Sequence, residues 1–223
     1  MSETRPAILA ICGSERAGGN TDRVLDHIGH LVTGAGANYR VIHLREAAIR
    51  SGCGPCGDCN VRPVPCAEAD DVAAVVDAMC QADAIVYAAP VHAFGMAALM
   101  QQFLERAGVG HLRFARPLRN KVALPVVTGR RYHHEFVYNQ LLNNILLNRM
   151  IPAVAGFPSV VHGGAPGSWA EDDEGRRTVE AGVERMLELV DFLARATRAG
   201  QVLDGHSAHV SNERIFLHQG VPS

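Results

Sequence analysis

The chain has 223 residues, of which 48% are hydrophobic and 20% are charged, and its formal net charge is −2. This composition favours a folded domain with a sizeable core and argues against a disordered chain. A protein that binds nucleic acid usually has an excess of basic residues, so the near-neutral charge argues against nucleic acid as a partner. No stretch of 18 consecutive apolar residues occurs, and we therefore expect no membrane partner.

Apolar runs rich in β-branched residues alternate along the chain with segments whose apolar residues recur at the helical period. The runs predict strands, and the periodic segments predict helices between and after them. Pro125 lies inside the fourth predicted strand, where a proline is unusual because it cannot donate a ladder hydrogen bond. The predicted strands are 7–12, 39–44, 84–89, 121–128 and 153–161, and the predicted helices begin near 20 and cover about 70–81, 96–107, 135–150 and 176–197.

Strands that alternate with helices predict a doubly wound α/β fold, which is a parallel sheet with helices on both faces. The strands are nearly uninterrupted apolar runs, as expected for strands covered on both sides. In such folds a ligand binds outside the carboxyl ends of the strands. We assign residues 1–199 to this domain, with an irregular cysteine-rich insert at about 45–69. Residues 200–223 form a C-terminal arm that is a candidate for packing on a partner subunit.

Residues 13–21, GSERAGGNT, lie between the first predicted strand and the first predicted helix. A helix that starts at such a loop presents free backbone N–H groups and the positive end of its dipole, and both favour anions. Neither the Walker loop nor the dinucleotide-binding glycine pattern is present. A capped turn without a ligand would also explain the glycines. As a phosphate site, the loop would use Ser14, Arg16, Gly19, Asn20 and Thr21.

Four of the six cysteines are clustered in the segment CGPCGDCNVRPVPC, with the spacing C-x2-C-x2-C-x6-C. This compact spacing suits the four thiolates of a [4Fe–4S] cluster. Structural zinc also takes four thiolates, and free thiols are the third alternative. The first residues, MSETRP, lack the pattern of a signal peptide, so we expect a cytoplasmic protein in which disulfides are disfavoured. The candidate metal ligands are Cys53, Cys56, Cys59 and Cys66.

Two segments together resemble those of a known family. The pattern Gly13-Ser14-x-Arg16-x-x-Gly19-Asn20-Thr21 is similar to the phosphate loop of the NAD(P)H-dependent FMN reductases. Residues 90–106, PVHAFGMAALMQQFLER, resemble the segment after the third strand in the same family. The resemblance implies bound FMN and a flavodoxin-like fold with strand order 2-1-3-4-5. The cysteine spacing resembles that of the iron-sulfur flavoproteins, which are a branch of this family.

The resemblance also implies roles for individual residues. In the family, the turn after the third strand runs along the flavin ring with its backbone amides facing the ring edge. His92 stands where the family has a tyrosine, and as an ionisable group it is a candidate catalytic residue. A glycine-rich segment after the fourth strand matches residues 128–130. The implied flavin contacts are Pro90, Val91, His92, Ala93, Phe94, Gly95, Thr128, Gly129 and Arg130.

We therefore expect an oxidoreductase in which FMN accepts a hydride from NAD(P)H and passes electrons on, through a [4Fe–4S] cluster if one is bound. The acceptor would be a small molecule or a protein. The alternative is an electron carrier or redox sensor without turnover of a small substrate. A phosphate-binding protein without flavin is a third hypothesis, because the fold alone does not decide function. The family resemblance also implies a homodimer or homotetramer.

Overall fold

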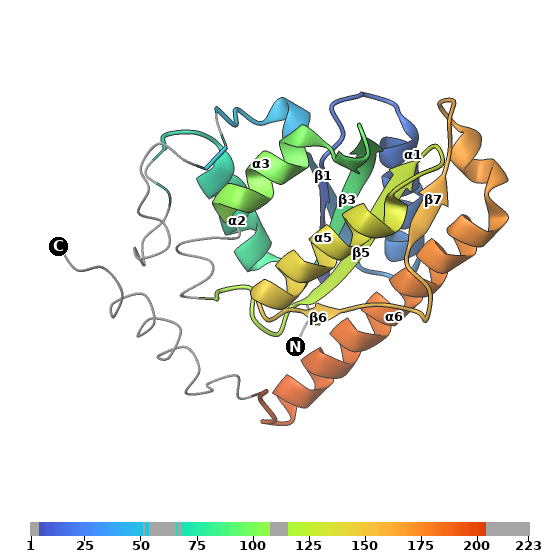
Figure 1. Ribbon diagram of the computed structural model, residues 1–223. Helices are drawn as coiled ribbons and strands as arrows, with labels where there is room; N and C mark the ends of the chain where they lie inside the picture. The colour runs from blue at the N-terminus through green and yellow to red at the C-terminus, as the bar shows by residue number, and fades with distance from the viewer. Residues whose placement is uncertain (1–4, 51, 54–65, 67, 108–115, 204–223) are drawn as a thin grey trace, which may run out of the picture.

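The computed structural model describes residues 5–50, 52–53, 66, 68–107 and 116–203, which form one sheet between two layers of helices (Figure 1). The main strands are all parallel, and their order confirms the predicted fold class. This order is β2 (Asn38–His43), β1 (Ala7–Cys12), β3 (Ala84–His92), β5 (Val122–Gly129) and β6 (Ile151–Pro152). Two short strands complete the sheet: β4 (Gly95–Met96) pairs antiparallel with β3, and β7 (Val160–His162) pairs parallel with β5.

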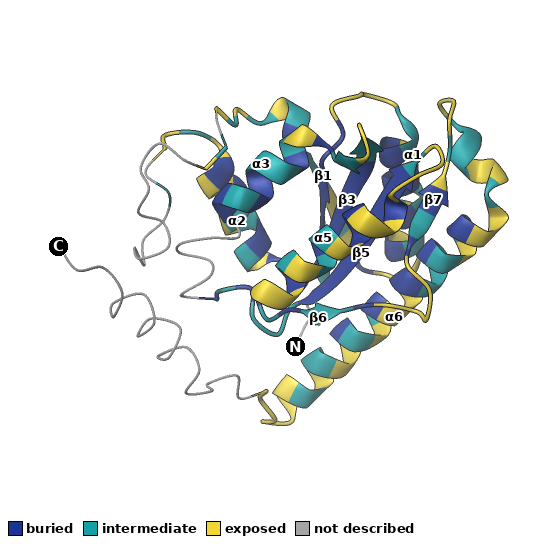
Figure 2. Ribbon diagram, viewed as in Figure 1, coloured by how far each residue is buried: buried dark blue, intermediate teal, exposed yellow. Residues whose placement is uncertain are grey.

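The helices are α1 (Asn20–Gly34), α2 (Val72–Gln81), α3 (Ala98–Ala107), α5 (His134–Leu147) and α6 (Asp173–Arg198), with short 3-10 helices η1 (Leu44–Glu46) and η2 (Ser168–Glu171). They cover both faces of the sheet because successive side chains of a strand point to opposite sides. Ile8 and Ala10 of β1 belong to the core under α1 and α6, whereas Leu9 and Ile11 belong to the core under α2, α3 and α5. Figure 2 shows that β1, β3 and β5 are mostly buried.

The predicted fifth strand, 153–161, is wrong over residues 153–159, because the chain pairs with β5 only at β6 and again at β7. Ala153 N–H donates to Ala123 O at 2.7 Å, and Val127 N–H donates to Ser159 O at 2.9 Å. Alternate residues of a strand direct their backbone groups to the same neighbouring strand. The backbone nitrogen of Pro125, between Ala123 and Val127, therefore also faces the chain between β6 and β7. Proline has no N–H to donate, and the neighbouring strand is interrupted opposite it.

Other boundaries differ by a few residues. The predicted helix at 96–107 begins at Ala98, because Gly95 and Met96 form β4. The last helix begins at Asp173 rather than 176, because the Asp172 side chain caps it by accepting a hydrogen bond from Gly175 N–H at 3.0 Å. Most of the predicted cysteine-rich insert and residues 204–223 of the predicted arm lie outside the described residues.

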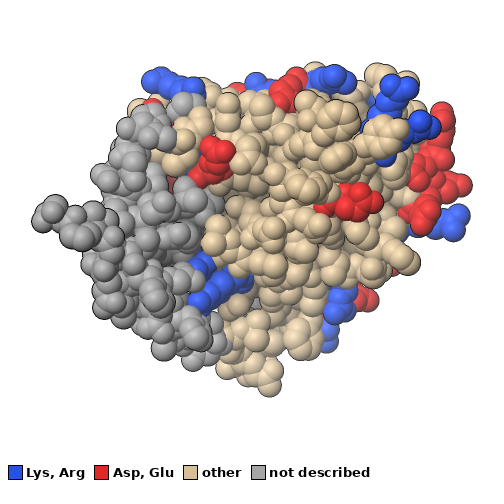
Figure 3. Space-filling model, in the orientation of Figure 1, with Lys and Arg blue, Asp and Glu red and all other residues tan. Residues whose placement is uncertain are grey.

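The outer face of α5 carries exposed apolar side chains. Phe136, Leu146 and Leu147 are exposed by 65%, 53% and 37%, and Figure 3 shows few charged residues over the middle of this face. Such a surface would suit the homo-oligomer expected from the family resemblance, which stays a prediction. Within the described part of the chain, no helix is both long and apolar enough to cross a membrane.

At Gly175 the backbone of α6 lies close to β7, and we expect Gly175→Ala to destabilise the protein. A Cβ at this position would lie 2.6 Å from the backbone oxygen of Val160, which cannot move without displacing β7. The free energy of unfolding should fall by about 1–3 kcal/mol, as for other overpacked sites, and urea titration followed by circular dichroism would measure it.

The matched control is Gly34→Ala in the last turn of α1, where a Cβ would meet nothing within 4 Å. Alanine favours helix by up to about 1 kcal/mol relative to glycine, so this control should be neutral or stabilising. Equal effects of the two substitutions would contradict the close packing of α6 on β7.

Candidate functional site

A cavity of about 390 Å³ lies where β1, β3 and β5 end. It brings together all the predicted cofactor-binding residues except Phe94 and Gly95. Phe94 is 65% exposed and lines a neighbouring hollow that also touches Arg130, while Gly95 pairs with His92 in the short hairpin. The lining residues are Ser14, Arg16, Gly19, Asn20, Thr21, Pro90, Val91, His92, Ala93, Thr128, Gly129, Arg130, Gly163, Gly164 and Pro166.

The first turn of α1 supplies the donors of this cavity. The helix begins at Asn20, with Gly19 as its N-cap in an extended conformation and without a side-chain cap. The amide N–H groups of Gly19, Asn20 and Thr21 donate to no acceptor among the described residues. Unpaired first-turn amides and the positive end of a helix dipole form an anion site. The predicted phosphate loop therefore has free donors, and they belong to the backbone.

The hydroxyl groups expected to bind phosphate already have protein partners. The Ser14 hydroxyl accepts a hydrogen bond from Arg16 N–H and lies at the same distance, 3.2 Å, from Arg16 O. Thr21 Oγ1 and Thr128 Oγ1 share a hydrogen bond of 2.7 Å, which links α1 to the end of β5. These hydrogen bonds fix the shape of the loop. The hydroxyl groups of Ser14 and Thr21 therefore help to position the backbone amides of the loop.

Asn20 connects α1 to a loop that the sequence did not predict to be part of the site. Its Nδ2 donates to Ala165 O at 2.9 Å, and its Oδ1 accepts from Gly167 N–H at 2.7 Å. A Cβ on Gly163 would lie 2.5 Å from Asn20 Nδ2, so the contact requires glycine there. The residues 163–166 thereby close one side of the cavity. Only their glycine content could have pointed to this role.

The turn between β3 and β4 has an unusual backbone. His92 pairs with Gly95, and the two residues between them, Ala93 and Phe94, have φ angles of 47° and 64°. Two-residue hairpins of this type normally place glycine or asparagine at such positions. Strained backbone at residues with side chains tends to cluster at active sites and ligand-binding turns. This is the turn that the family resemblance places along the flavin ring.

A side-chain contact joins this turn to the phosphate loop. His92 Nδ1 lies 3.1 Å from Glu15 Oε2, and Glu15 Oε1 accepts a hydrogen bond from Leu99 N–H at 3.4 Å. Glu15 thus holds the β3–β4 turn and the start of α3 against the loop. No local sequence pattern marks Glu15 for this role, because its partners are distant in sequence.

A pair of histidines lies beside the cavity. His134 is 2% exposed, and burial, followed by the neighbouring His162, lowers its pKa. The centroids of the two rings are 4.4 Å apart, and His162 Nδ1 lies 3.2 Å from Asp172 Oδ2.

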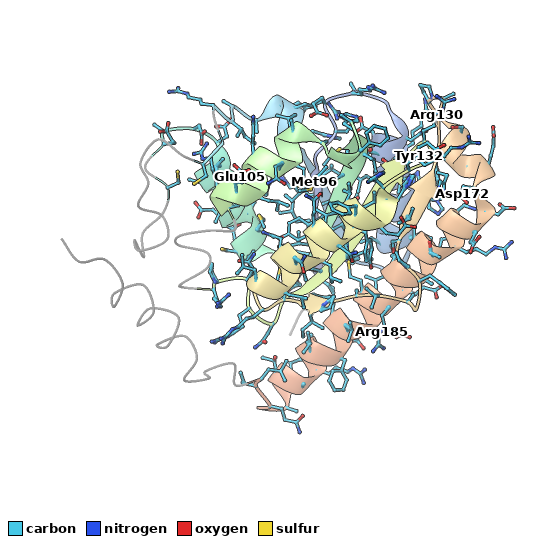
Figure 4. All side chains as sticks on the ribbon, in the orientation of Figure 1. Met96, Glu105, Arg130, Tyr132, Asp172 and Arg185 are labelled. Atoms are coloured by element: carbon cyan, nitrogen blue, oxygen red, sulfur yellow. The ribbon has the colours of Figure 1, made fainter. Side chains whose placement is uncertain are left out.

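Figure 4 shows Arg130 and Tyr132 at the same end of the sheet, while Glu105 lies on α3.

The first and fourth cysteines of the predicted metal site contact the end of α3. Cys53 N–H donates to Glu105 Oε2 at 3.2 Å, and Arg106 Nη2 donates to Cys66 Sγ at 3.4 Å. Arg106 is also paired with Asp70, and this ion pair lowers the pKa of Asp70 to about 2. The other two candidate ligands, Cys56 and Cys59, lie outside the described residues.

The parallel sheet, the unpaired amides after β1 and the cavity across the ends of β1, β3 and β5 are features of the flavodoxin-like fold, a class in which mononucleotides bind at this end of the sheet. A family model for NADPH-dependent FMN reductases matches residues 6–164. The chain therefore belongs to this family.

Two curated relatives are named as iron-sulfur flavoproteins. One, from Methanocaldococcus jannaschii, is 28% identical over 197 residues, which cover 84% of this chain and 99% of the relative. The other, from Archaeoglobus fulgidus, is 30% identical over 179 residues, which cover 78% of this chain and 85% of the relative.

Solved structures show the same fold. RosB with bound 8-demethyl-8-formylriboflavin-5′-phosphate has a TM-score of 0.66 at 16% identity, covering 92% of this chain and 93% of that one. An apo NADH:FMN oxidoreductase has a TM-score of 0.58 at 20% identity, covering 82% of this chain and 89% of that one. Family and fold together make the protein a flavoprotein with a redox role.

Because Asn20 ties α1 to the loop 163–167, Asn20→Ala should weaken FMN binding by about tenfold. The estimate assumes two lost hydrogen bonds of about 1 kcal/mol each, with part of the loss recovered by water. Quenching of FMN fluorescence would measure the affinity. Asn139→Ala, at an exposed position of α5, is the matched control. Equal affinities of the two variants would show that the loop does not help to close the cavity.

Proposed function

We propose that this protein is an FMN-dependent NAD(P)H oxidoreductase that delivers electrons to a small-molecule or protein acceptor. The observation on which the proposal rests is the single cavity that joins the unpaired amides of residues 19–21 to the backbone of residues 90–93. The description of the family as NADPH-dependent supports a nicotinamide donor.

The residues around the cavity fit FMN in charge and size. The amides of residues 19–21, together with Arg16, would hold the phosphate, and residues 90–93 and 128–130 would line the ring. The volume of about 390 Å³ lies within the range typical of small-molecule sites. When bound, FMN supplies the hydride and single-electron chemistry of the reaction. The protein would bind and orient FMN and set the electric field around its ring.

His92 is the ionisable side chain that we propose for holding a proton next to the ring. It lines the cavity, and its Nδ1 faces the Glu15 carboxylate. The carboxylate fixes the orientation of the imidazole, which leaves Nε2 as the atom that can exchange a proton.

If this proposal is correct, the FMN-loaded protein oxidises NADPH or NADH continuously when a quinone is supplied as acceptor. Absorbance of the reduced nicotinamide measures the rate, and FMN without protein, at the same concentration, is the control. An electron carrier would instead consume little nicotinamide until a separate reductase is added. A colourless protein that also fails to bind added FMN would overturn both functions.

We further propose that Cys53, Cys56, Cys59 and Cys66 hold a [4Fe–4S] cluster that receives electrons from the flavin. The compact spacing and the two relatives named as iron-sulfur flavoproteins support it. At the described cysteines, Glu105 holds the Cys53 amide and Arg106 donates to the Cys66 sulfur. Hydrogen bonds to a ligand sulfur stabilise the thiolate and tune the potential of a cluster.

Anaerobically purified protein should contain about four irons per chain, and Cys53→Ser or Cys66→Ser should lose most of them while keeping FMN. Iron analysis and the visible spectrum measure this. Cys80→Ser in α2, outside the motif, is the matched control and should keep its iron. One zinc per chain in place of iron would contradict the cluster, and metal-free protein would leave the cysteines as free thiols.

A further inference from the structure

A buried carboxylate lies directly behind the phosphate loop. Asp22, in the first turn of α1, is only 7% exposed. Its Oδ2 accepts a hydrogen bond from Gly18 N–H at 2.8 Å, and Gly18 has a left-handed φ of +67°. Asp22 therefore holds the loop in its observed shape, and the amide of Gly18 is not available to a ligand.

The negative charge of this carboxylate is unfavourable for anion binding at the loop. Burial alone would raise the pKa of Asp22, but hydrogen bonds from Arg45 and Gly18 lower it below its ordinary value, so the group is negatively charged. The unpaired amides of residues 19–21 begin three residues before it in the same turn. An anion bound there would be repelled by Asp22, and because Asp22 is buried, solvent screens the repulsion only weakly.

Arg45 supplies the compensating charge. Its Nη1 lies 2.9 Å from Asp22 Oδ1, and its side chain is only 16% exposed. Its other contact, at 3.5 Å, is with the exposed Glu46. Arg45 belongs to η1, which follows β2, and β2 lies beside β1 in the sheet. The order of the strands therefore places the Arg45 guanidinium behind the phosphate loop.

Two further side chains lie close to the Asp22 carboxylate. Burial raises the pKa of Cys12 to about 12, so its thiol keeps the proton and donates to Asp22 Oδ1 at 3.2 Å. His43 Nδ1 lies 3.5 Å from the same oxygen. Cys12, Asp22 and His43 have the spacing of a metal site, but the Arg45 guanidinium already occupies the position next to Oδ1. Arg45 thus binds the carboxylate oxygen that a metal ion in this group would need.

We propose that Arg45 is a specificity-determining residue for the phosphate group of the flavin. Its charge neutralises Asp22, so that Asp22 can hold the loop without repelling the phosphate. Asp22 and Arg45 are positioning residues, because the cavity itself is lined by other residues. The inference rests on the proposed binding of FMN in this cavity. It predicts that Arg45 matters for FMN and not for riboflavin, which has the same ring but no phosphate.

The test compares the dissociation constants of FMN and riboflavin in Arg45→Met. The ratio of the riboflavin constant to the FMN constant should fall by about tenfold, because only FMN meets the uncompensated carboxylate. In the double variant Asp22→Asn with Arg45→Met the ratio should return toward the wild-type value. Arg40→Met, an exposed position of β2, removes the same net charge and should leave the ratio unchanged. Arg45→Lys keeps the charge and should also preserve it.

A ratio that is unchanged in Arg45→Met overturns the inference while FMN binding itself stands. A wild-type protein that binds neither flavin overturns the proposed function instead. If Arg45→Met does not fold, Asp22→Asn alone decides the question. Removing the carboxylate while keeping Arg45 should raise the ratio, and an unchanged or lower ratio would refute the role of Arg45.

Discussion

The site depends on the backbone at Gly13, directly after β1, which contacts both the neighbouring strand β3 and helix α3. Gly13 N–H donates to Ala88 O at 2.8 Å, which extends the pairing of β1 with β3 by one residue. A Cβ on Gly13 would lie 2.5 Å from Met100 Cβ, so α3 packs directly against the backbone there. The amides that follow start from a point that the sheet and α3 determine together. This rigidity lets backbone groups, rather than flexible side chains, form the anion site.

Helix α3 links the two proposed redox groups. Its first turn bonds to Glu15, which also contacts His92 at the cavity, and its last turn holds the backbone of Cys53 and the sulfur of Cys66. A helix of ten residues is about 15 Å long. A single rigid element would then set the separation between flavin and cluster, and the family-like segment 90–106 has a role at both of its ends.

Much of this arrangement could be predicted from the chain. Apolar runs and turn residues located the central strands to within a few residues, because buried parallel strands leave a strong local signal. The glycine-rich loop and the turn at 90–95 were recognised from residues adjacent in sequence. The prediction failed at 153–161, where an apolar run meets the interrupted edge opposite Pro125. Strand pairing there depends on Pro125 in the neighbouring strand. The sequence of residues 153–161 therefore cannot reveal the interruption.

By itself the sequence determined which local elements form, which loop follows β1 and which cysteines are spaced for a metal. The tertiary structure alone decided how the side chains of the loop are used. Asn20 binds the 163–166 region, Thr21 binds Thr128, and Asp22 is neutralised by Arg45. The partners come from other strands and loops, and only the order of the sheet brings them together. Backbone donors at a helix start follow from local sequence, whereas the charge balance around them depends on residues that meet only in the folded chain.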